Sequence, residues 1–295
     1  MKKTAFIAIV GRPNVGKSTL LNSILGEKVA IVSSKPQTTR NRITGIQTVG
    51  GNQFIFLDTP GIHKPRTRLG DFMVKTTATT LGGVDSAILV TEAREEVGDI
   101  EAQIISKFKS EGIRAILVIN KIDMVRKENI VKTIAAYASA YDFEAVVPVS
   151  AKSGKGVDIV LSECEKFLTE SDWFFPEDVA TDQPERQVAA EIIREKLLRS
   201  LDEEIPHGTA VTIEEWKEKR GTVSIRAEIY CEKASHKGII IGKGAATIKR
   251  IGMYAREDLE KMLDAKVFLD LYVRVKENWR DSDFSISNFG YKEEE

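Results

Sequence analysis

The N-terminal region contains a loop whose residue types and spacing suit the binding of phosphate groups. Residues 11–18 read Gly-Arg-Pro-Asn-Val-Gly-Lys-Ser and match the pattern Gly-x-x-x-x-Gly-Lys-Ser. Glycines let backbone N–H groups wrap around phosphate oxygens, and the N-terminus of a following helix adds favourable partial charge. We expect Lys17 to reach the β- and γ-phosphates of a nucleotide and the Ser18 hydroxyl to bind Mg²⁺. The other loop residues predicted to contact the nucleotide are Gly11, Asn14, Val15, Gly16 and Thr19.

A second motif predicts which base is bound. Residues 120–123 read Asn-Lys-Ile-Asp and follow an apolar run that predicts a buried strand. The carboxylate of Asp123 can accept hydrogen bonds from both the ring N–H and the exocyclic amine of guanine, and adenine lacks this donor pair. Because an unpaired buried polar group costs about 1–3 kcal/mol, the motif favours guanine over adenine. The other residues of the predicted base site are Asn120, Lys121, Ser150, Ala151 and Lys152.

A third motif, Asp-Thr-Pro-Gly at residues 58–61, closes another apolar run. We expect Asp58 to hold Mg²⁺ through a water molecule. Gly61 can offer its N–H to the γ-phosphate, and its flexible backbone suits a segment that moves when that phosphate leaves. The next residue, Ile62, cannot hydrogen-bond the attacking water, and we interpret His63 as a surface residue without a catalytic role. Slow intrinsic hydrolysis of the nucleotide is therefore expected.

The composition fits a globular protein of about two domains that works in a reducing compartment. The chain has 295 residues, of which 42% are apolar and 29% are charged. Its two cysteines, Cys164 and Cys231, are far apart and its three histidines lack metal-ligand spacing, so a disulfide framework or a zinc site is disfavoured. The apolar run near the start is too short for a secretory signal, and no run approaches the roughly 20 residues that span a membrane. We expect a cytoplasmic protein.

Residues 1–171 alternate short apolar runs with amphipathic segments, and this order predicts an α/β domain with a mostly parallel sheet covered on both faces. Gly-Gly-Asn at residues 50–52 predicts a hairpin turn. Each motif then follows the carboxyl end of a strand, where ligands bind in such sheets. The expected strands are 6–10, 43–49, 54–57, 87–90, 115–119 and 145–149. The expected helices are 18–25, 71–82, 99–110, 127–141 and 156–169.

The pattern changes after residue 171. Residues 172–183 are aromatic and contain proline, and we expect a linker there. Residues 184–295 predict an α+β domain of the order α-β-β-α-α-β, with an acidic tail at 293–295. Residues 1–171 carry a net charge of +5 and residues 172–295 carry −6, so nucleic-acid binding by the second domain must depend on a local patch. The expected elements are a helix at 184–203, strands at 210–216 and 223–230, a helix–loop–helix unit over 235–263 and a strand at 267–275.

The helix–loop–helix unit resembles the KH signature for RNA binding, in which a Gly-x-x-Gly loop clamps a single-stranded backbone. Residues 233–250 contain five Lys or Arg and no acidic residue, which supplies the local patch. The loop reads Gly-Lys-Gly-Ala at residues 242–245, so an alanine Cβ replaces the last glycine and restricts how closely the backbone meets RNA. We expect residues 239–241 and Ile248 to line an apolar groove for unstacked bases. The predicted RNA contacts are Lys237, Ile241, Gly242, Lys243, Gly244, Ala245, Lys249 and Arg250.

Taken together, these motifs resemble the Era branch of bacterial GTPases. The resemblance is carried by the phosphate loop, by Gln-Thr-Thr-Arg at residues 37–40, by Asp-Thr-Pro-Gly-Ile-His at residues 58–63 and by Asn-Lys-Ile-Asp at residues 120–123. With the KH-type domain it covers about residues 4–290. It implies a P-loop GTPase domain that binds GTP or GDP with Mg²⁺, followed by a KH domain.

The resemblance also assigns roles to individual residues. Residues 37–40 are the first switch of that family, and Thr39 would bind Mg²⁺ in the GTP state. Asn14 would hold K⁺ beside the phosphates as an activating ion. GTP binding would reshape residues 28–45 and 59–75. The implied metal ligands are Ser18, Thr39 and Asp58, and the implied catalytic residues are Lys17, Thr39, Gly61 and Asn14.

For the second domain, the resemblance implies binding near the 3′ end of small-subunit ribosomal RNA during assembly of the small ribosomal subunit. We expect a monomer. The alternative is a GTP-controlled interaction protein on a protein partner or peripherally at the inner membrane face, because basic residues at 233–250 suit anionic lipid as well as RNA. The sequence lacks the aromatic belt and large apolar face of a membrane-surface helix, which favours RNA. A metabolic NTPase is disfavoured because no second-substrate pocket is indicated.

Overall fold

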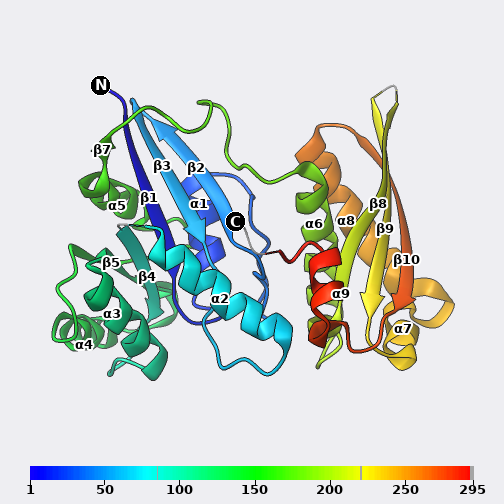
Figure 1. Cartoon of the computed structure of the whole chain (residues 1–295), viewed down its shortest axis with the longest axis horizontal. Coiled ribbons are helices and arrows are strands. Elements are labelled where there is room, and N and C mark those ends of the chain that lie inside the picture. Colours follow the sequence, from blue (N-terminus) through cyan, green and yellow to red (C-terminus); the bar gives the residue numbers. More distant parts are fainter. Residues whose placement is uncertain (85, 220, 293–295) are drawn as a thin grey trace. The chain divides into compact units, whose positions relative to one another are not determined.

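The computed structural model describes residues 1–84, 86–219 and 221–292, so the acidic tail at 293–295 lies outside the described residues (Figure 1). The chain divides into two compact units. The first comprises Met1–Pro65 and Gly70–Asp182, and the second comprises Arg66–Leu69 and the chain from Gln183 onward. Among the described residues, no helix combines the length and the apolar character needed to cross a membrane.

The first unit is built on a mostly parallel sheet, as predicted. Its strands are β1 (Lys3–Val10), β2 (Ile43–Val49), β3 (Asn52–Asp58), β4 (Ser86–Glu92), β5 (Arg114–Asn120), β6 (Ala145–Pro148) and β7 (Thr169–Glu170). They lie in the order β2-β3-β1-β4-β5-β6, with β2 antiparallel to β3 and the short β7 antiparallel to β1. The turn between β2 and β3 places Gly50 at φ 58° and Gly51 at φ 92°, a region that glycine adopts without a Cβ penalty.

Helices cover both faces of this sheet because successive residues of its strands point to opposite sides (Figure 1). Ile7 and Ile9 of β1 pack with α1 and α5, and Ala8 and Val10 pack with α2, α3 and α4. Both clusters are nearly free of polar side chains, which explains why the central strands read as continuous apolar runs. The helices are α1 (Lys17–Leu25), α2 (Arg68–Gly82), α3 (Asp99–Glu111), α4 (Lys127–Ala138) and α5 (Val157–Cys164).

Two helices end earlier than the sequence predicts. The helix predicted at 127–141 ends at Ala138, because Tyr141 and Phe143 turn towards the core and their rings contact each other at 5.0 Å. The helix predicted at 156–169 ends at Cys164, because the chain leaves it to form β7 beside β1. In both places tertiary packing overrides a local helical pattern.

The segment that follows β7 lies along the open edge of the sheet. The buried amide of Gln53 on β3 accepts hydrogen bonds from the N–H groups of Phe174 (2.9 Å) and Phe175 (3.1 Å) and donates one to the Phe175 carbonyl (2.9 Å). Further along, the Ile46 N–H of β2 donates to the Ala180 carbonyl at 2.8 Å. The Ile46 contact satisfies a backbone group that the edge strand β2 would otherwise expose, and the Gln53 contacts satisfy backbone groups of residues 174 and 175.

The second unit has the predicted order α-β-β-α-α-β, which confirms the α+β, KH-type class. The strands lie in the order β10-β9-β8, with β9 and β10 parallel and β8 and β9 antiparallel. Ile193, Leu197, Ile229, Ile251 and Val273 belong to the core between the sheet and its helices. The elements are α6 (Glu185–Ser200), β8 (Ala210–Lys219), β9 (Thr222–Cys231), α7 (Ala234–Ile241), α8 (Ala246–Leu263), β10 (Lys266–Val275) and α9 (Asp283–Asn288).

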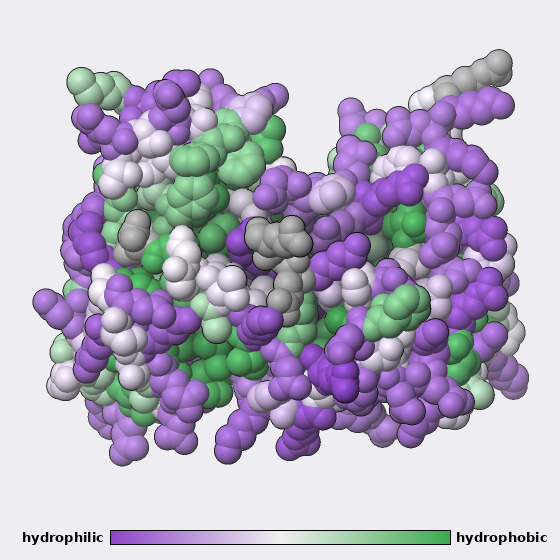
Figure 2. Space-filling view, in the orientation of Figure 1, coloured by the Kyte–Doolittle hydropathy of each residue, from purple (hydrophilic) through white to green (hydrophobic). Residues whose placement is uncertain are grey.

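The short helix α9 and the turn before it were not predicted. Trp279 is fully buried, and its indole N–H donates to the Gly208 carbonyl at 2.9 Å. The indole ring packs against Phe289 at 5.2 Å and Tyr291 at 6.1 Å. A six-residue helix has too few turns for a recognisable apolar period, so packing around Trp279 organises this segment. Figure 2 shows hydrophilic side chains over most of the face in view, with apolar ones in smaller patches.

Candidate functional site

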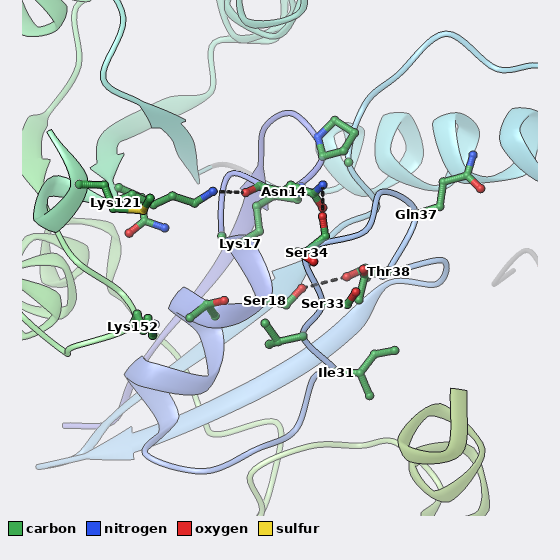
Figure 3. Close-up of a pocket in the computed structure, with 18 of the residues that line it drawn as sticks. Asn14, Lys17, Ser18, Ile31, Ser33, Ser34, Gln37, Thr38, Lys121 and Lys152 are labelled. Atoms are coloured by element: carbon green, nitrogen blue, oxygen red, sulfur yellow. Dashed lines mark hydrogen bonds between the residues drawn. The ribbon is translucent and has the colours of Figure 1, made fainter. Parts of the chain in front are cut away.

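A cavity of about 520 Å³ opens in the first unit at the carboxyl ends of the parallel strands (Figure 3). Its size lies in the range of about 300–1,000 Å³ that is typical of small-molecule sites. Five of the residues predicted to bind nucleotide do not line this cavity, namely Gly11, Val15, Asp58, Ser150 and Ala151. The residues that line it are Pro13, Asn14, Gly16, Lys17, Ser18, Thr19, Ile31, Val32, Ser33, Ser34, Gln37, Thr38, Thr39, Gly61, Asn120, Lys121, Asp123, Met124 and Lys152.

The phosphate loop has a backbone that its residue types make possible. Gly11 lies at φ 148°, Gly16 at φ 99° and Asn14 at φ 63°. A Cβ at Gly16 would lie 2.2 Å from Asn120 Nδ2, and one at Gly11 would lie 2.3 Å from the Val90 carbonyl oxygen. The two glycines are therefore required for close packing as well as for conformation. The loop leads directly into α1, whose first N–H groups have no partner within the helix.

Lys17 folds back over this loop. Its ammonium donates to the carbonyls of Gly11 (3.2 Å) and Arg12 (3.0 Å) and is buried. Burial lowers the pKa of Lys17 to about 8, and the nearby charge of Asp58 opposes the shift. A phosphate group in the cavity would supply the anionic partner that a buried ammonium requires.

Three oxygen-bearing side chains meet beside Lys17. The Ser18 hydroxyl donates to Asp58 Oδ2 at 2.6 Å and lies 2.8 Å from the Thr39 hydroxyl. Asp58 is fully buried, and its Oδ1 has no hydrogen-bond partner in the described part of the chain. Burial raises the pKa of Asp58 to about 6, against the opposing effects of Lys17 and Ser18. Oxygen ligands with an orphaned carboxylate oxygen fit Mg²⁺, so Ser18, Thr39 and Asp58 would hold that ion.

The base motif divides into two kinds of residue. Asn120 donates from Nδ2 to the Val15 carbonyl (2.8 Å) and accepts at Oδ1 from the Ala151 N–H (3.0 Å), so it joins two loops. Asp123 lies on the cavity wall, and the nearby Ser150 hydroxyl, with the charges of Lys152 and Lys121, lowers the pKa of its carboxyl. Asp123 is therefore an ionised acceptor at neutral pH, as reading guanine requires.

Two contacts tie the first switch segment to its surroundings. His63 Nδ1 lies 2.9 Å from the Gly61 carbonyl, which can only accept, so Nδ1 donates and Nε2 accepts from the Gln37 amide at 3.3 Å. His63, which the sequence predicts as a surface residue without a catalytic role, is half-buried and bridges two segments. Its lack of a catalytic role stays a prediction. The Asn14 amide donates to the Ser34 carbonyl at 2.7 Å (Figure 3).

In the second unit, the loop at residues 242–245 joins α7 to α8. Gly242 lies at φ 75°, and a Cβ there would lie 2.3 Å from the Thr247 hydroxyl oxygen and 2.9 Å from the Thr247 backbone nitrogen. Ala245 lies at φ 62°, in the left-handed region that costs a residue with a Cβ about 1–2 kcal/mol. Ala245 replaces the last glycine of the signature and thus has a backbone conformation that favours glycine and is strained for alanine.

A groove of about 350 Å³ runs between α8 and β10 beside this loop. Of the predicted lining residues 239–241, Ile240 is fully buried in the core and cannot contact a base, whereas Ile239 is exposed and neither it nor Ile241 lines this particular groove. Base contacts by Ile239 and Ile241 stay a prediction. Ile248 and Lys249 do line it. The sequence reading missed the strand that forms the other wall, although exposed apolar residues in the last strand were a usable signal. The further lining residues are Gly252, Met253, Arg256, Val267, Phe268, Leu269 and Leu271.

The other predicted RNA contacts are distributed around the loop. Lys243 and Gly244 are exposed at its tip, and Lys237 is half-buried on α7. Arg250 lies on a different side of α8, where it lines a hollow with Arg199 of α6. Residues 249 and 250 are about 100° apart on a helix, so both cannot face the same groove.

The fold and these two sites define a P-loop nucleotide-binding domain joined to a KH domain. A family model described as 50S ribosome-binding GTPase matches residues 6–121, and one described as KH domain matches residues 204–280. The chain is 50% identical to the GTPase Era of Clostridium novyi over 99% of this chain and 100% of that protein. It is 47% identical to the GTPase Era of Ruminiclostridium cellulolyticum over 98% of each.

Two solved structures superpose on nearly the whole chain, each with a TM-score of 0.94 and 39% identity. One is Era in complex with MgGDPNP and nucleotides 1506–1542 of 16S ribosomal RNA, with 99% of each chain covered. The other is a variant of Aquifex aeolicus Era bound to GDP and AlF4⁻, with 98% and 99% covered. The chain belongs to the Era family of GTPases. Binding of a guanine nucleotide with Mg²⁺ and hydrolysis of GTP follow from that membership.

Proposed function

We propose that this protein is a GTP-controlled switch that binds small-subunit ribosomal RNA near its 3′ end and acts in assembly of the small ribosomal subunit. Residues 1–171 form its GTP-binding domain, residues 172–183 its linker and residues 184–295 its RNA-binding domain. The observation that carries the proposal is that one chain combines a guanine-nucleotide cavity with a strained glycine loop beside an apolar groove. The family description that names the 50S ribosome covers only residues 6–121, whereas the full-length relative holds 16S RNA.

In the nucleotide site, the residues divide the work of phosphate transfer. Lys17 supplies positive charge at the phosphates, and the backbone N–H groups of the loop and of Gly61 supply fixed donors where charge develops. Ser18, Thr39 and Asp58 hold Mg²⁺, which when bound neutralises charge on the phosphates. Gly61 lies directly against the phosphate loop, because a Cβ at Gly61 would lie 2.6 Å from Pro13 Cα. A phosphate bound in the loop would therefore lie close to Gly61.

Slow intrinsic turnover is part of the proposal. The Ile62 side chain has no polar atom with which to orient water, and its backbone N–H donates to the Gly11 carbonyl at 3.3 Å. The neighbouring His63 uses Nδ1 on the Gly61 carbonyl and Nε2 on Gln37, so neither ring nitrogen is available to orient water in this arrangement. Positioning of the attacking water then requires another source, such as a partner or a bound cation.

Asn14 is the residue that would hold such a cation. Its amide nitrogen is used on the Ser34 carbonyl, and its Oδ1 is outside this hydrogen bond and is the type of ligand that K⁺ prefers. We expect GTP hydrolysis to be at least several-fold faster in K⁺ than in Na⁺ at matched ionic strength, and Asn14→Ala to remove the difference. Equal turnover of the parent protein in both salts would exclude an activating cation.

In the RNA site, the loop and the groove have separate roles. Gly242 gives the loop its conformation, since a Cβ there would collide with Thr247 and its φ of 75° favours glycine. Lys243 and Lys249 supply charge, and the apolar side chains of Met253 and Phe268, 44% and 64% exposed, offer surfaces on which bases can pack. An exposed phenylalanine ring gains the most free energy when another apolar group covers it and removes it from water.

The proposal is tested by titrating RNA fragments from the 3′ end of small-subunit ribosomal RNA, and a scrambled sequence, with the full-length protein. Gly242→Asp should weaken binding at least tenfold, because it adds negative charge to the loop and a side chain that must displace Thr247. Lys243→Ala and Lys249→Ala should weaken it less and reduce its salt dependence. Gly221→Asp, at the same φ of 75° and at an open position in the second unit, is the matched control for added charge and backbone strain.

Anionic vesicles provide the arm that distinguishes the membrane alternative. Vesicle binding without sequence-selective RNA binding would replace the proposed function with that alternative. In the face shown in Figure 2, apolar side chains of the second unit appear in separate patches rather than as one broad surface. RNA binding that is equally tight in Gly242→Asp would remove the KH assignment.

A further inference from the structure

Four contacts from three other segments of the first unit hold the phosphate loop. One of the contacting residues, Glu101, belongs to none of the sequence motifs. Arg12 forms an ion pair with Glu101, and a Cβ at Gly61 would lie 2.6 Å from Pro13. The four anchored pairs are Arg12 with Glu101, Pro13 with Gly61, the Asn14 carbonyl with Lys121 at 2.7 Å and the Val15 carbonyl with Asn120 at 2.8 Å.

Glu101 occupies an unusual position for a carboxylate. It lies in the first turn of α3, and its side chain is fully buried. Oε1 accepts from Arg12 Nε, whereas Oε2 has no hydrogen-bond partner within the described residues. A Cβ at Gly98 would lie only 2.5 Å from Oε2, so glycine at that position makes room for the carboxylate. The residues around Glu101 therefore leave space for its charged carboxylate, although the packing of α3 does not need a charge at that position.

Burial of the Arg12–Glu101 ion pair costs free energy, and this cost argues that the pair serves to hold the phosphate loop. Desolvation of a carboxylate costs several kcal/mol, and replacing a buried ion pair by apolar residues is often neutral or stabilising. The Arg12 side chain is 18% exposed, so it could reach solvent or the cavity if it were released. The Arg12 carbonyl is one of the two that receive the Lys17 ammonium. Holding the Arg12 side chain thus also holds the peptide group on which Lys17 rests.

We propose that Glu101 is a positioning residue for GTP hydrolysis: it clamps Arg12 and so holds the loop backbone where Lys17 is aimed at the phosphates. Glu101 touches no substrate and acts through Arg12. Without this clamp, the Arg12 peptide group on which Lys17 rests is no longer fixed. Lys17 still attracts the phosphates in the ground state, whereas charge stabilisation in the transition state, which depends on where Lys17 is placed, is weakened.

This account predicts a split between binding and turnover. In Glu101→Gln, which keeps the shape and an acceptor oxygen but removes the charge, kcat for GTP should fall about tenfold and KM should change less than threefold. Arg12→Gln should give a decrease of similar size. Because both act through one contact, the double variant should be no slower than either single variant, whereas independent effects would multiply. Glu111→Gln, near the other end of α3, is the matched control and should keep the parent kcat.

A second double variant keeps the test decisive if Glu101→Gln folds poorly. Glu101→Leu with Arg12→Met removes both charges together, and thermal unfolding should then be close to that of the parent. The positioning role predicts that kcat per folded, nucleotide-binding molecule stays about tenfold low. A purely structural role predicts that kcat recovers with the fold. A kcat within twofold of the parent in this variant, or in a well-folded Glu101→Gln, overturns the proposal.

Discussion

Asp58 and Lys17 carry opposite charges in one buried site, and burial moves their pKa values towards each other, to about 6 and about 8. Binding of Mg²⁺ needs Asp58 ionised, and binding of phosphate needs Lys17 protonated. Binding of the Mg²⁺–GDP complex should therefore release a proton from Asp58 at pH values below about 6. Above about pH 8 it should take up a proton at Lys17. Between these values the two groups should exchange few protons.

Calorimetric titration in buffers of different ionisation enthalpy measures the number and sign of the protons exchanged. Asp58→Asn should lose the proton release at pH 5.5 and keep the uptake at pH 8.5. This comparison within one nucleotide also subtracts protons that the phosphates themselves exchange. Persistence of the full release in Asp58→Asn would show that Asp58 is not the titrating group.

Ala245 is a strained residue whose strain can be relieved. At φ 62° its Cβ costs about 1–2 kcal/mol, and glycine at the same position avoids this but loses about 0.5–1 kcal/mol of chain entropy. Ala245→Gly should therefore raise the free energy of unfolding by about 0.5–1 kcal/mol in urea titrations. Ala246→Gly, at a helical φ of −64°, is the control and should lower it by about 1 kcal/mol. A loss of stability in Ala245→Gly would contradict the assignment of strain.

At the scale of elements, the attachment of the linker to the sheet depends on one side chain, that of Gln53. Gln53 makes its hydrogen bonds to the backbone of Phe174 and Phe175 from a fully buried position. Gln53→Leu leaves these backbone groups without partners, and because each unpaired group costs about 1–3 kcal/mol the segment should detach to reach water.

Hydrogen exchange measured by mass spectrometry checks this. Amides of residues 172–182 should exchange at least tenfold faster in Gln53→Leu, while the central strands β1 and β4 keep their protection. Gln47→Leu, on the partly exposed side of β2, is the control and should leave the exchange unchanged. Unaltered exchange in Gln53→Leu would mean that the aromatic packing of Phe6 on Phe174, 5.0 Å apart, holds the segment by itself.

At the scale of the whole molecule, the proposed function requires coupling between the two units. If the protein binds RNA more tightly with a GTP analogue than with GDP, RNA must raise the affinity for the analogue over GDP by the same factor. We expect a factor of at least five. Measuring all four dissociation constants on the full-length protein checks the equality. Because the four constants close a thermodynamic cycle, unequal factors would show that a titration had not reached equilibrium. A factor of one would show that the KH domain binds RNA without control by nucleotide.

The sequence by itself determined the class of each unit and its principal residues. The motifs at 11–18, 120–123 and 242–245 are contiguous, because a backbone that wraps phosphate or approaches RNA needs neighbouring residues of fixed type. The strand and helix order was equally readable, since each period depends on residues within one element. These features can be read from the sequence without knowing which residues lie beside them in the folded protein.

Only the tertiary structure decided which side chains meet across the chain. Glu101 reaches Arg12 over 89 residues, and Gln53 reaches Phe175 over 122. Neither pair has a local signature. Ile240 was wrongly predicted to face a groove for a related reason: Ile240 and Ile239 are adjacent in sequence, but the rotation of α7 buries one and exposes the other. Long-range contacts and helix rotation are set by the packing of the whole unit, so they could be read only from its fold.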